Sequence, residues 1–113
     1  MFLRVKLSPN LAYKLSRILH EYAGHYYHSP NNRQIAMYAG HSLWLVWHRA
    51  KHRLGRPDHR DVTIMCEEWV FFCQKLLEQR TREDPSNEDL KALFHCFASD
   101  HEVVIGKVSD DQT

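Results

Sequence analysis

The sequence has few of the residues from which phosphate-binding loops and catalytic motifs are built. Its four glycines are scattered along the chain, at positions 24, 40, 55 and 106. A phosphate-binding loop needs clustered glycines, and a G-x-S-x-G segment is also missing. Neighbouring acidic residues occur as short runs typical of a solvated surface. We therefore expect that this protein is not an enzyme.

Cysteine is scarce as well. The three cysteines are an odd number, and none forms a C-x-x-C pair. Cys66 and Cys73 are seven residues apart, and that spacing on a helix gives about 10 Å of rise, too far for a disulfide. We expect small buried thiols in a reducing, cytoplasmic setting. A nucleophilic pair of Cys96 with His95 or His101 stays an alternative, although adjacent residues on a helix point apart.

The chain lacks a long apolar run. The best candidate, LWLVW at 43–47, has five residues, whereas a membrane-spanning helix needs roughly 20. The opening MFLRVKLSPN carries Arg4 and Lys6 inside its apolar stretch, unlike a secretory leader. We expect neither a leader nor a membrane partner.

The apolar residues that are present recur at helical spacing. They predict a mainly α protein, a compact bundle of about four helices. The helices are expected at 9–27, 31–54, 61–80 and 87–99. The length predicts a single helical domain over 1–108, and 109–113 is expected to be a frayed tail. The apolar end segments, 2–7 and 102–108, are expected to pair as a short two-stranded ribbon.

Capping signals support the helix boundaries. Ser8 and Ser29 each precede a proline, an order typical of an N-cap followed by the first helical residue. Two pairs resemble capping boxes, Asp58 with Asp61 and Ser86 with Asp89. Gly55 suits the end of the second helix.

The net charge of +1 hides an uneven distribution. Residues 1–60 carry ten Lys or Arg against two acidic residues, a net of +8, and residues 61–113 carry five against twelve, a net of −7. Two interpretations remain open. Either the halves interleave their charges on one surface, or a basic face binds an anionic partner.

Positive charge concentrates in WHRAKHRLGRPDHR, residues 47–60. Cations at the end of the second helix complement its dipole by about 0.3–1 kcal/mol each, which explains part of this set. The remainder indicates an acidic neighbour in the fold or an anionic partner outside it. The candidate partner-binding or phosphate-binding residues are Arg49, Lys51, Arg53, Arg56 and Arg60.

The second helix has another face that favours binding. His41, His48 and His52 are spaced by seven and four residues, so they share one side of the helix. Met37 and Trp44 lie on that side too, opposite the apolar core stripe. The helix is therefore either sandwiched between elements or presents this face to a partner.

A second apolar spot is expected on the far side of the third helix, at Ile64 and Phe71. The candidate apolar partner-binding residues are thus Met37, His41, Trp44, His48, His52, Ile64 and Phe71.

Metal binding is less favoured. The pairs His48/His52 and His25/His28 have helical spacing, but no carboxylate or thiolate accompanies them in a metal-site pattern. HEYAGH at 20–25 is not H-E-x-x-H. We expect no metal and no cofactor.

These patterns predict a small interaction module that binds and modulates a partner protein. The partner is expected to handle nucleic acid, as do the targets of accessory proteins of phages and mobile elements. Direct nucleic-acid binding through residues 47–60 is the alternative. Self-association through the second helix would give a homodimer. A histidine-based metal protein or an enzyme is less favoured.

Overall fold

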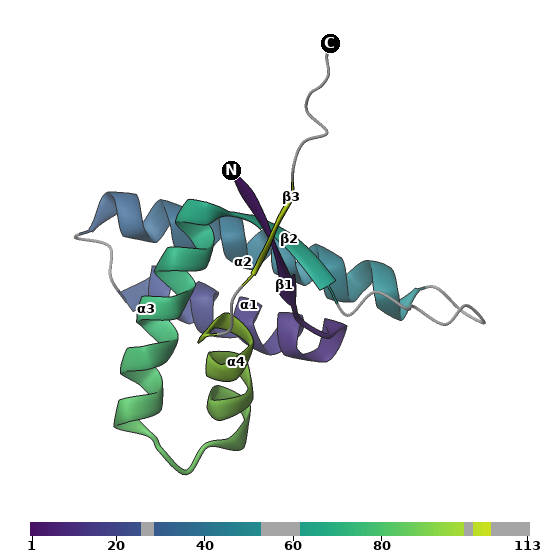
Figure 1. Cartoon of the computed structure of the whole chain (residues 1–113). Helices are drawn as coiled ribbons and strands as arrows, with labels where there is room; N and C mark the ends of the chain where they lie inside the picture. Colours follow the sequence, from purple (N-terminus) through teal and green to yellow (C-terminus); the bar gives the residue numbers. More distant parts are fainter. Residues whose placement is uncertain (26–28, 53–61, 99–100, 105–113) are drawn as a thin grey trace. The chain divides into compact units, whose positions relative to one another are not determined.

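Four helices and a small three-stranded antiparallel sheet form the described part of the chain in the computed structural model (Figure 1). The structure describes residues 1–25, 29–52, 62–98 and 101–104. In chain order the elements are β1 (Phe2–Lys6), α1 (Pro9–His25), α2 (Pro30–Lys51), β2 (Val62–Cys66), α3 (Glu67–Glu83), α4 (Glu88–Ala98) and β3 (Glu102–Val104). The predicted mainly α fold is confirmed.

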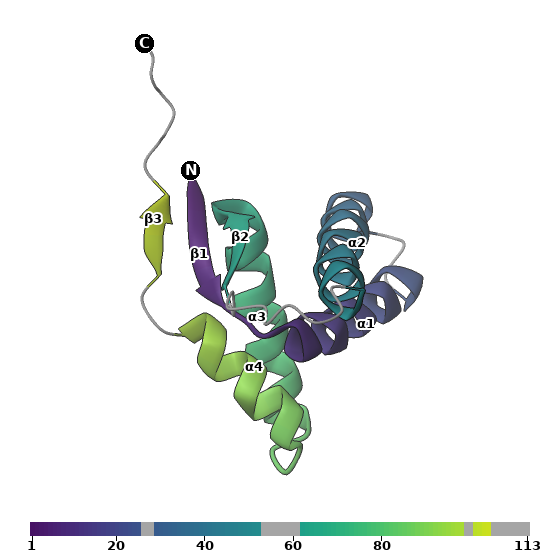
Figure 2. The same ribbon diagram turned by 90° about the vertical axis from the view of Figure 1, so that its right-hand side faces the viewer.

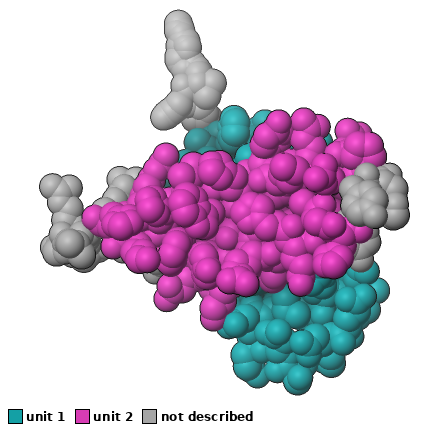
Figure 3. All heavy atoms as spheres, turned by 180° about the vertical axis from the view of Figure 1, so that it is seen from behind, with its two compact units in different colours: residues 1–6, 62–113 teal, residues 7–61 magenta. Residues whose placement is uncertain are grey.

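The chain divides into two compact units, which Figure 3 shows in different colours. Unit 1 comprises residues 1–6 and 62–113, with the sheet, α3 and α4. Unit 2 comprises residues 7–61, with α1 and α2. The single domain expected over 1–108 stays a prediction, and the tail expected at 109–113 lies outside the described residues.

The sheet of unit 1 has the strand order β2-β1-β3, with the three strands side by side (Figure 2). Phe2 is paired with Cys66 on one side and with Val104 on the other. The predicted pairing of the two end segments is therefore confirmed, but these two strands belong to a sheet of three. Residues 105–108 of the predicted second strand lie outside the described residues.

The helix predicted over 61–80 is wrong at its start, because Val62–Cys66 form a strand. Thr63 and Met65 are buried, and Val62 and Ile64 are exposed, which is the alternation of a strand with one covered face. β-branched residues favour this conformation, and β1 supplies the partner. The helix begins at Glu67, where Glu67 and Glu68 complement the positive end of the dipole.

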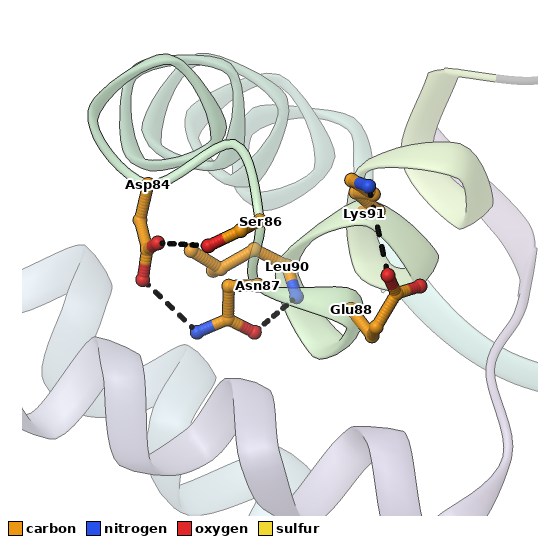
Figure 4. Close-up of polar contacts among 6 residues, drawn as sticks. All are labelled: Asp84, Ser86, Asn87, Glu88, Leu90 and Lys91. Carbon is orange, nitrogen blue, oxygen red and sulfur yellow. Dashed lines mark hydrogen bonds and ion pairs between the residues drawn. The ribbon is translucent and has the colours of Figure 1, made fainter.

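The turn between α3 and α4 is held by polar side chains (Figure 4). The backbone N–H of Leu90 donates to Asn87 Oδ1 at 3.1 Å, so Asn87 caps α4. The Asn87 amide also donates to Asp84 Oδ2 at 3.4 Å. Ser86 donates to Asp84 Oδ1 instead. The cap predicted at Ser86 with Asp89 is therefore displaced by one residue.

Unit 2 is an antiparallel pair of helices. The predicted cap at Ser8 is present, because the N–H of Leu11 donates to Ser8 Oγ at 3.2 Å. Near the other end of α1, Arg33 Nε of α2 donates to the carbonyl oxygen of Ala23 at 3.0 Å. The predicted α2 residue Leu54 and the predicted caps at Gly55 and at Asp58 with Asp61 lie outside the described residues. Ser29 precedes α2 as predicted, but its side chain makes no capping hydrogen bond.

Small side chains allow α1 and α2 to approach closely. The buried residues of this kind are Ala12, Ser16, Ala23, Ala36, Ala39 and Gly40. A Cβ atom at Gly40 would lie 3.2 Å from two atoms of the His20 ring and 3.3 Å from the Cβ of Leu19. Gly40 is thus the point at which α1 sits against the backbone of α2.

We expect the two helical glycines to respond in opposite directions to a side chain. Gly40→Leu should lower the free energy of unfolding by roughly 1–3 kcal/mol, because the Leu19 and His20 contacts leave no room for it. Gly24→Ala should be neutral or stabilise by up to about 1 kcal/mol, since nothing lies within 4 Å of its Cβ position. Urea denaturation followed by circular dichroism measures both. Equal midpoints for the two variants would contradict this packing.

A second pair of variants tests the start of α4. Asn87→Ala should cost about 1 kcal/mol, because the N–H of Leu90 loses its acceptor. Ser86→Ala should have a smaller effect, since the Ser86 hydroxyl donates to Asp84 Oδ1 at 3.4 Å and the cap of α4 is Asn87. Thermal denaturation of both variants is the measurement, and a larger loss for Ser86→Ala would restore the capping box predicted from the sequence.

Candidate protein-docking site

A ladder of stacked rings runs along one side of α2. The Trp44 and His48 rings are nearly parallel, with centroids 4.8 Å apart, and the His41 ring is also nearly parallel to Trp44, with centroids 6.1 Å apart. His52 meets His48 edge to face at 4.4 Å. We call His41, Trp44, His48 and His52 the ring ladder. Their spacing of three or four residues places them one turn apart on the helix.

The ring ladder is accessible. His41 and His52 are exposed, and Trp44 and His48 are half-buried. Met37, one turn before His41, is 44% exposed. The structure therefore brings together the five residues of α2 that the sequence singled out for an apolar binding face. Whether this face is sandwiched or presented to a partner stays a prediction.

Trp47 connects the ring ladder to α1. Its ring lies 4.4 Å from the Tyr13 ring and 6.5 Å from the Trp44 ring. The Lys51 ammonium sits over Trp47, with Nζ 4.9 Å from the ring centroid. Both contacts hold the indole in place, so the aromatic surface is ordered before any partner arrives.

The structure describes two residues of the predicted basic set. Arg49 and Lys51 are both exposed. Lys51 is engaged with Trp47 beside the ring ladder, whereas Arg49 follows His48 directly and so points about 100° away around the helix. Arg53, Arg56 and Arg60 lie outside the described residues.

A shallow depression of about 520 Å³ lies between α1 and α2, beside the ring ladder. Its lining consists of Tyr13, Ser16, Arg17, His20, Glu21 and Trp44. Arg17 Nη1 donates to the Tyr13 hydroxyl oxygen at 3.3 Å, and this hydrogen bond raises the pKa of Arg17. The α1 residues of this lining were not predicted from the sequence. The signal in the sequence was a pair of polar rings, Tyr13 and His20, which are seven residues apart and so lie on one face of α1, beside its apolar core stripe.

Ile64 and Phe71 do not form the single helical spot that was predicted. Ile64 lies on β2 and Phe71 on α3, because the helix starts six residues later than expected. Both are exposed, at 54% and 59%. Lys75 Nζ lies 5.1 Å from the Phe71 ring centroid. Ile64 is paired with Arg4 on β1, and it shares the outward face of the sheet with Phe2, an exposed residue that was not predicted as part of the site.

The charge imbalance follows the two units. Residues 7–61 carry eight Lys or Arg against three acidic residues, a net of +5, and the rest of the chain carries seven against eleven, a net of −4. Within the described part of unit 2, Glu21 is the single acidic residue. Charges of opposite sign are therefore not interleaved on the helices of unit 2.

The histidines do not gather into a recognisable metal site in the described residues. No group of three or more His, Cys, Asp or Glu side chains there could hold a metal ion. His25 is exposed near the end of α1, and its predicted partner His28 lies outside the described residues. No described helix has both the length and the apolar character of a membrane span.

The described cysteines lack the environment of an activated nucleophile. Burial raises the pKa of Cys73 to about 12 and also raises the pKa of Cys96. A reactive thiol needs the opposite shift. The His101 ring is 3.1 Å from the carbonyl oxygen of Phe97, and His95 is exposed.

These environments predict how the thiols react. In the native protein at pH 8, a disulfide reagent should modify Cys66 and Cys96, and Cys73 should react after unfolding. Folding raises the pKa of Cys73 from 9.0, so its contribution to stability is complete below pH 9 and is lost as the pH rises toward 12. Cys73→Ala should leave the native thiol count at two. Three thiols reacting at one rate would contradict the burial of Cys73.

Comparisons with models of known protein families, with curated proteins and with solved structures return no match to this chain. What this protein does is therefore inferred from the geometry and charge of its own residues, and the ring ladder of unit 2 is the feature on which that inference depends.

Proposed function

We propose that this protein is a small, non-enzymatic interaction module that binds and modulates a partner protein through the ring ladder of α2. The observation that carries the proposal is that the rings stack on one another. Trp44 is stacked with His48 at 4.8 Å and with His41 at 6.1 Å, so its indole is held by the imidazoles one turn before and one turn after it. Such a surface is rigid, partly apolar and exposed.

Rigid aromatic residues are suited to protein recognition. An interface loses less conformational entropy when its anchoring side chains are already held in place. Tryptophan is also enriched among the residues that contribute most to binding, and Met is enriched at interface cores. Trp44 and Met37 supply these groups on one side of α2, and the imidazoles provide hydrogen-bonding edges around them.

The same stacking argues against a platform for nucleic-acid bases. Proteins that bind single strands offer free aromatic faces on which bases stack. Here a base would have to displace His41 or His48 from Trp44, or displace Tyr13 or Lys51 from Trp47. Each displacement would break an existing contact, so base stacking is disfavoured.

The positive charge of unit 2 favours an acidic partner surface. Complementary charge mainly accelerates association and selects among partners. As expected from the sequence, we propose that this partner handles nucleic acid and that the two proteins meet in the cytoplasm. Direct phosphate binding by residues 47–60 is the second candidate, because Arg49 and Lys51 are exposed. A homodimer formed through the ring ladder is a special case of protein binding, in which the partner is a second copy of the chain.

The test is capture of the partner by tagged protein, with nuclease and high salt, followed by titration of the purified partner. Trp44→Ala and His48→Ala should each weaken binding at least about tenfold, since they remove rigid interface anchors. Phe2→Ala is the matched control, because Phe2 is an exposed aromatic on β1, in the other unit. It should bind like the unmodified protein.

Other results would select the alternatives. Recovery of nucleic acid alone, lost steeply as salt rises and abolished by Arg49→Gln with Lys51→Gln, would contradict the proposal and favour phosphate binding. A concentration-dependent dimer that Trp44→Ala dissociates would identify a second copy as the partner. Equal binding by the Trp44 and Phe2 variants would remove the ring ladder from the site.

A further inference from the structure

We infer that this protein forms a homodimer in which the β2 strands of two copies pair antiparallel and join the two sheets into one. The inference concerns unit 1 and does not rest on the function proposed for the ring ladder of unit 2. β1 lies between β2 and β3, so β2 has no neighbouring strand on its outer side among the described residues (Figure 2). Such a free edge offers N–H and C=O groups to another strand.

The ladder between β1 and β2 identifies which backbone groups lie at this edge. The N–H of Glu67 donates to the carbonyl oxygen of Met1 at 3.1 Å, and this pair continues the register of the two strands. Hydrogen-bonded pairs alternate along antiparallel strands, so Met65 and Thr63 also direct their backbone groups to β1. The other residues of β2 direct their backbone groups to the free edge, and these are Val62, Ile64 and Cys66.

The three edge residues are arranged symmetrically about Ile64, the middle residue of β2. In an antiparallel pair centred there, Ile64 lies opposite Ile64 of the second copy, and Val62 lies opposite Cys66. Every outward N–H then meets an outward C=O. Each hydrogen-bonded pair exchanges two bonds, so the three pairs give six. The edge of β2 is therefore complementary to itself.

The side chains of β2 favour the same occupant. The strand, VTIMC, contains neither a charged residue nor a proline, which commonly prevent edge strands from pairing. Around a two-fold axis each strand meets its own sequence, and an uncharged strand avoids pairs of like charge. Val62 and Ile64 are 37% and 54% exposed in the single chain. Pairing would place them against apolar residues of the second copy.

The opposite edge of the sheet is less suited to pairing. β3 has three residues, and two of them, Glu102 and Val104, are paired with Arg4 and Phe2. Because these β1 residues direct their backbone groups away from β2, both pairs are the hydrogen-bonded ones. Within β3, Val103 alone then directs its backbone groups outward. The edge of β2 offers three such residues, so it is the edge at which we place the second copy.

Sedimentation equilibrium of the untagged full chain measures this association. The weight-average mass should rise from the 13.5 kDa of one chain toward twice that value as the concentration increases from micromolar to millimolar. Ile64→Lys should weaken the dimer at least about tenfold, because it places two ammonium groups opposite each other at the two-fold axis. Circular dichroism confirms that the variant is folded, as its exposed position leads us to expect.

The matched control is Phe2→Lys. Phe2 and Ile64 are both 54% exposed and share the outward face of the sheet, but Phe2 lies on the central strand. The substitution makes the same change of charge one strand away from the edge, so it should change the dissociation constant less than about threefold. Equal losses for the two variants would show a general effect of charge and overturn the inference.

Amide hydrogen exchange, followed by NMR, tests the register. In the dimer the N–H groups of Ile64 and Cys66 should exchange slowly, and dilution to the monomer should accelerate both. Those of Thr63 and Met65 should stay protected in monomer and dimer, because they are directed to β1. If dilution leaves the exchange of Ile64 and Cys66 unchanged, the edge of β2 is not the interface.

The remaining outcomes separate this inference from the function proposed for unit 2. A monomer at every concentration would overturn the homodimer, whatever the ring ladder binds. A dimer that Trp44→Ala dissociates and Ile64→Lys leaves intact would also overturn it, and would assign self-association to the ring ladder. A dimer lost in Ile64→Lys and kept in Trp44→Ala would support the edge of β2 as the interface.

Discussion

The close approach of α1 to α2 is the constraint on which the candidate site depends. Gly40 lets the His20 ring and Leu19 lie against the backbone of α2, and alanines on both helices line the same contact. At this separation Tyr13 reaches Trp47, with ring centroids 4.4 Å apart. A wider spacing would part these rings and open the depression beside Trp44. The aromatic surface is thus a product of small residues at the helix interface.

Ring stacking along α2 then decides which ligands the surface can accept. Rings three or four residues apart meet each other, so π faces that could have held a base are used within the protein. The ring edges and the Met37 side chain remain available for contact with a partner. The rings are already held in place in the folded protein, so binding a partner does not cost the conformational entropy of ordering them. Cations beside the rings, Lys51 and Arg17, add long-range attraction without occupying the apolar surface.

Much of unit 2 could be predicted from the sequence, because helical spacing and Ser-Pro signals are local. The face with Met37, Trp44 and His48 follows from spacing alone. The strand β2 could not be predicted in this way. Val62 to Met65 fit a helical arc as well as a strand, and pairing with β1, nearly sixty residues earlier, decides between them. The α1 side of the depression was missed because it depends on how two helices pack.

The register of the sheet explains how the two units share one chain. Lys6 and Val62 are paired neighbours on β1 and β2, so residues 7–61 form an insertion between two adjacent strands. Pairing these strands first would require closing a long loop, which has a large entropic cost. The contacts between α1 and α2 are local by comparison, and forming them shortens the loop that remains. We therefore expect the helical pair to form early, so that the unit carrying the candidate site does not depend on the sheet for its order.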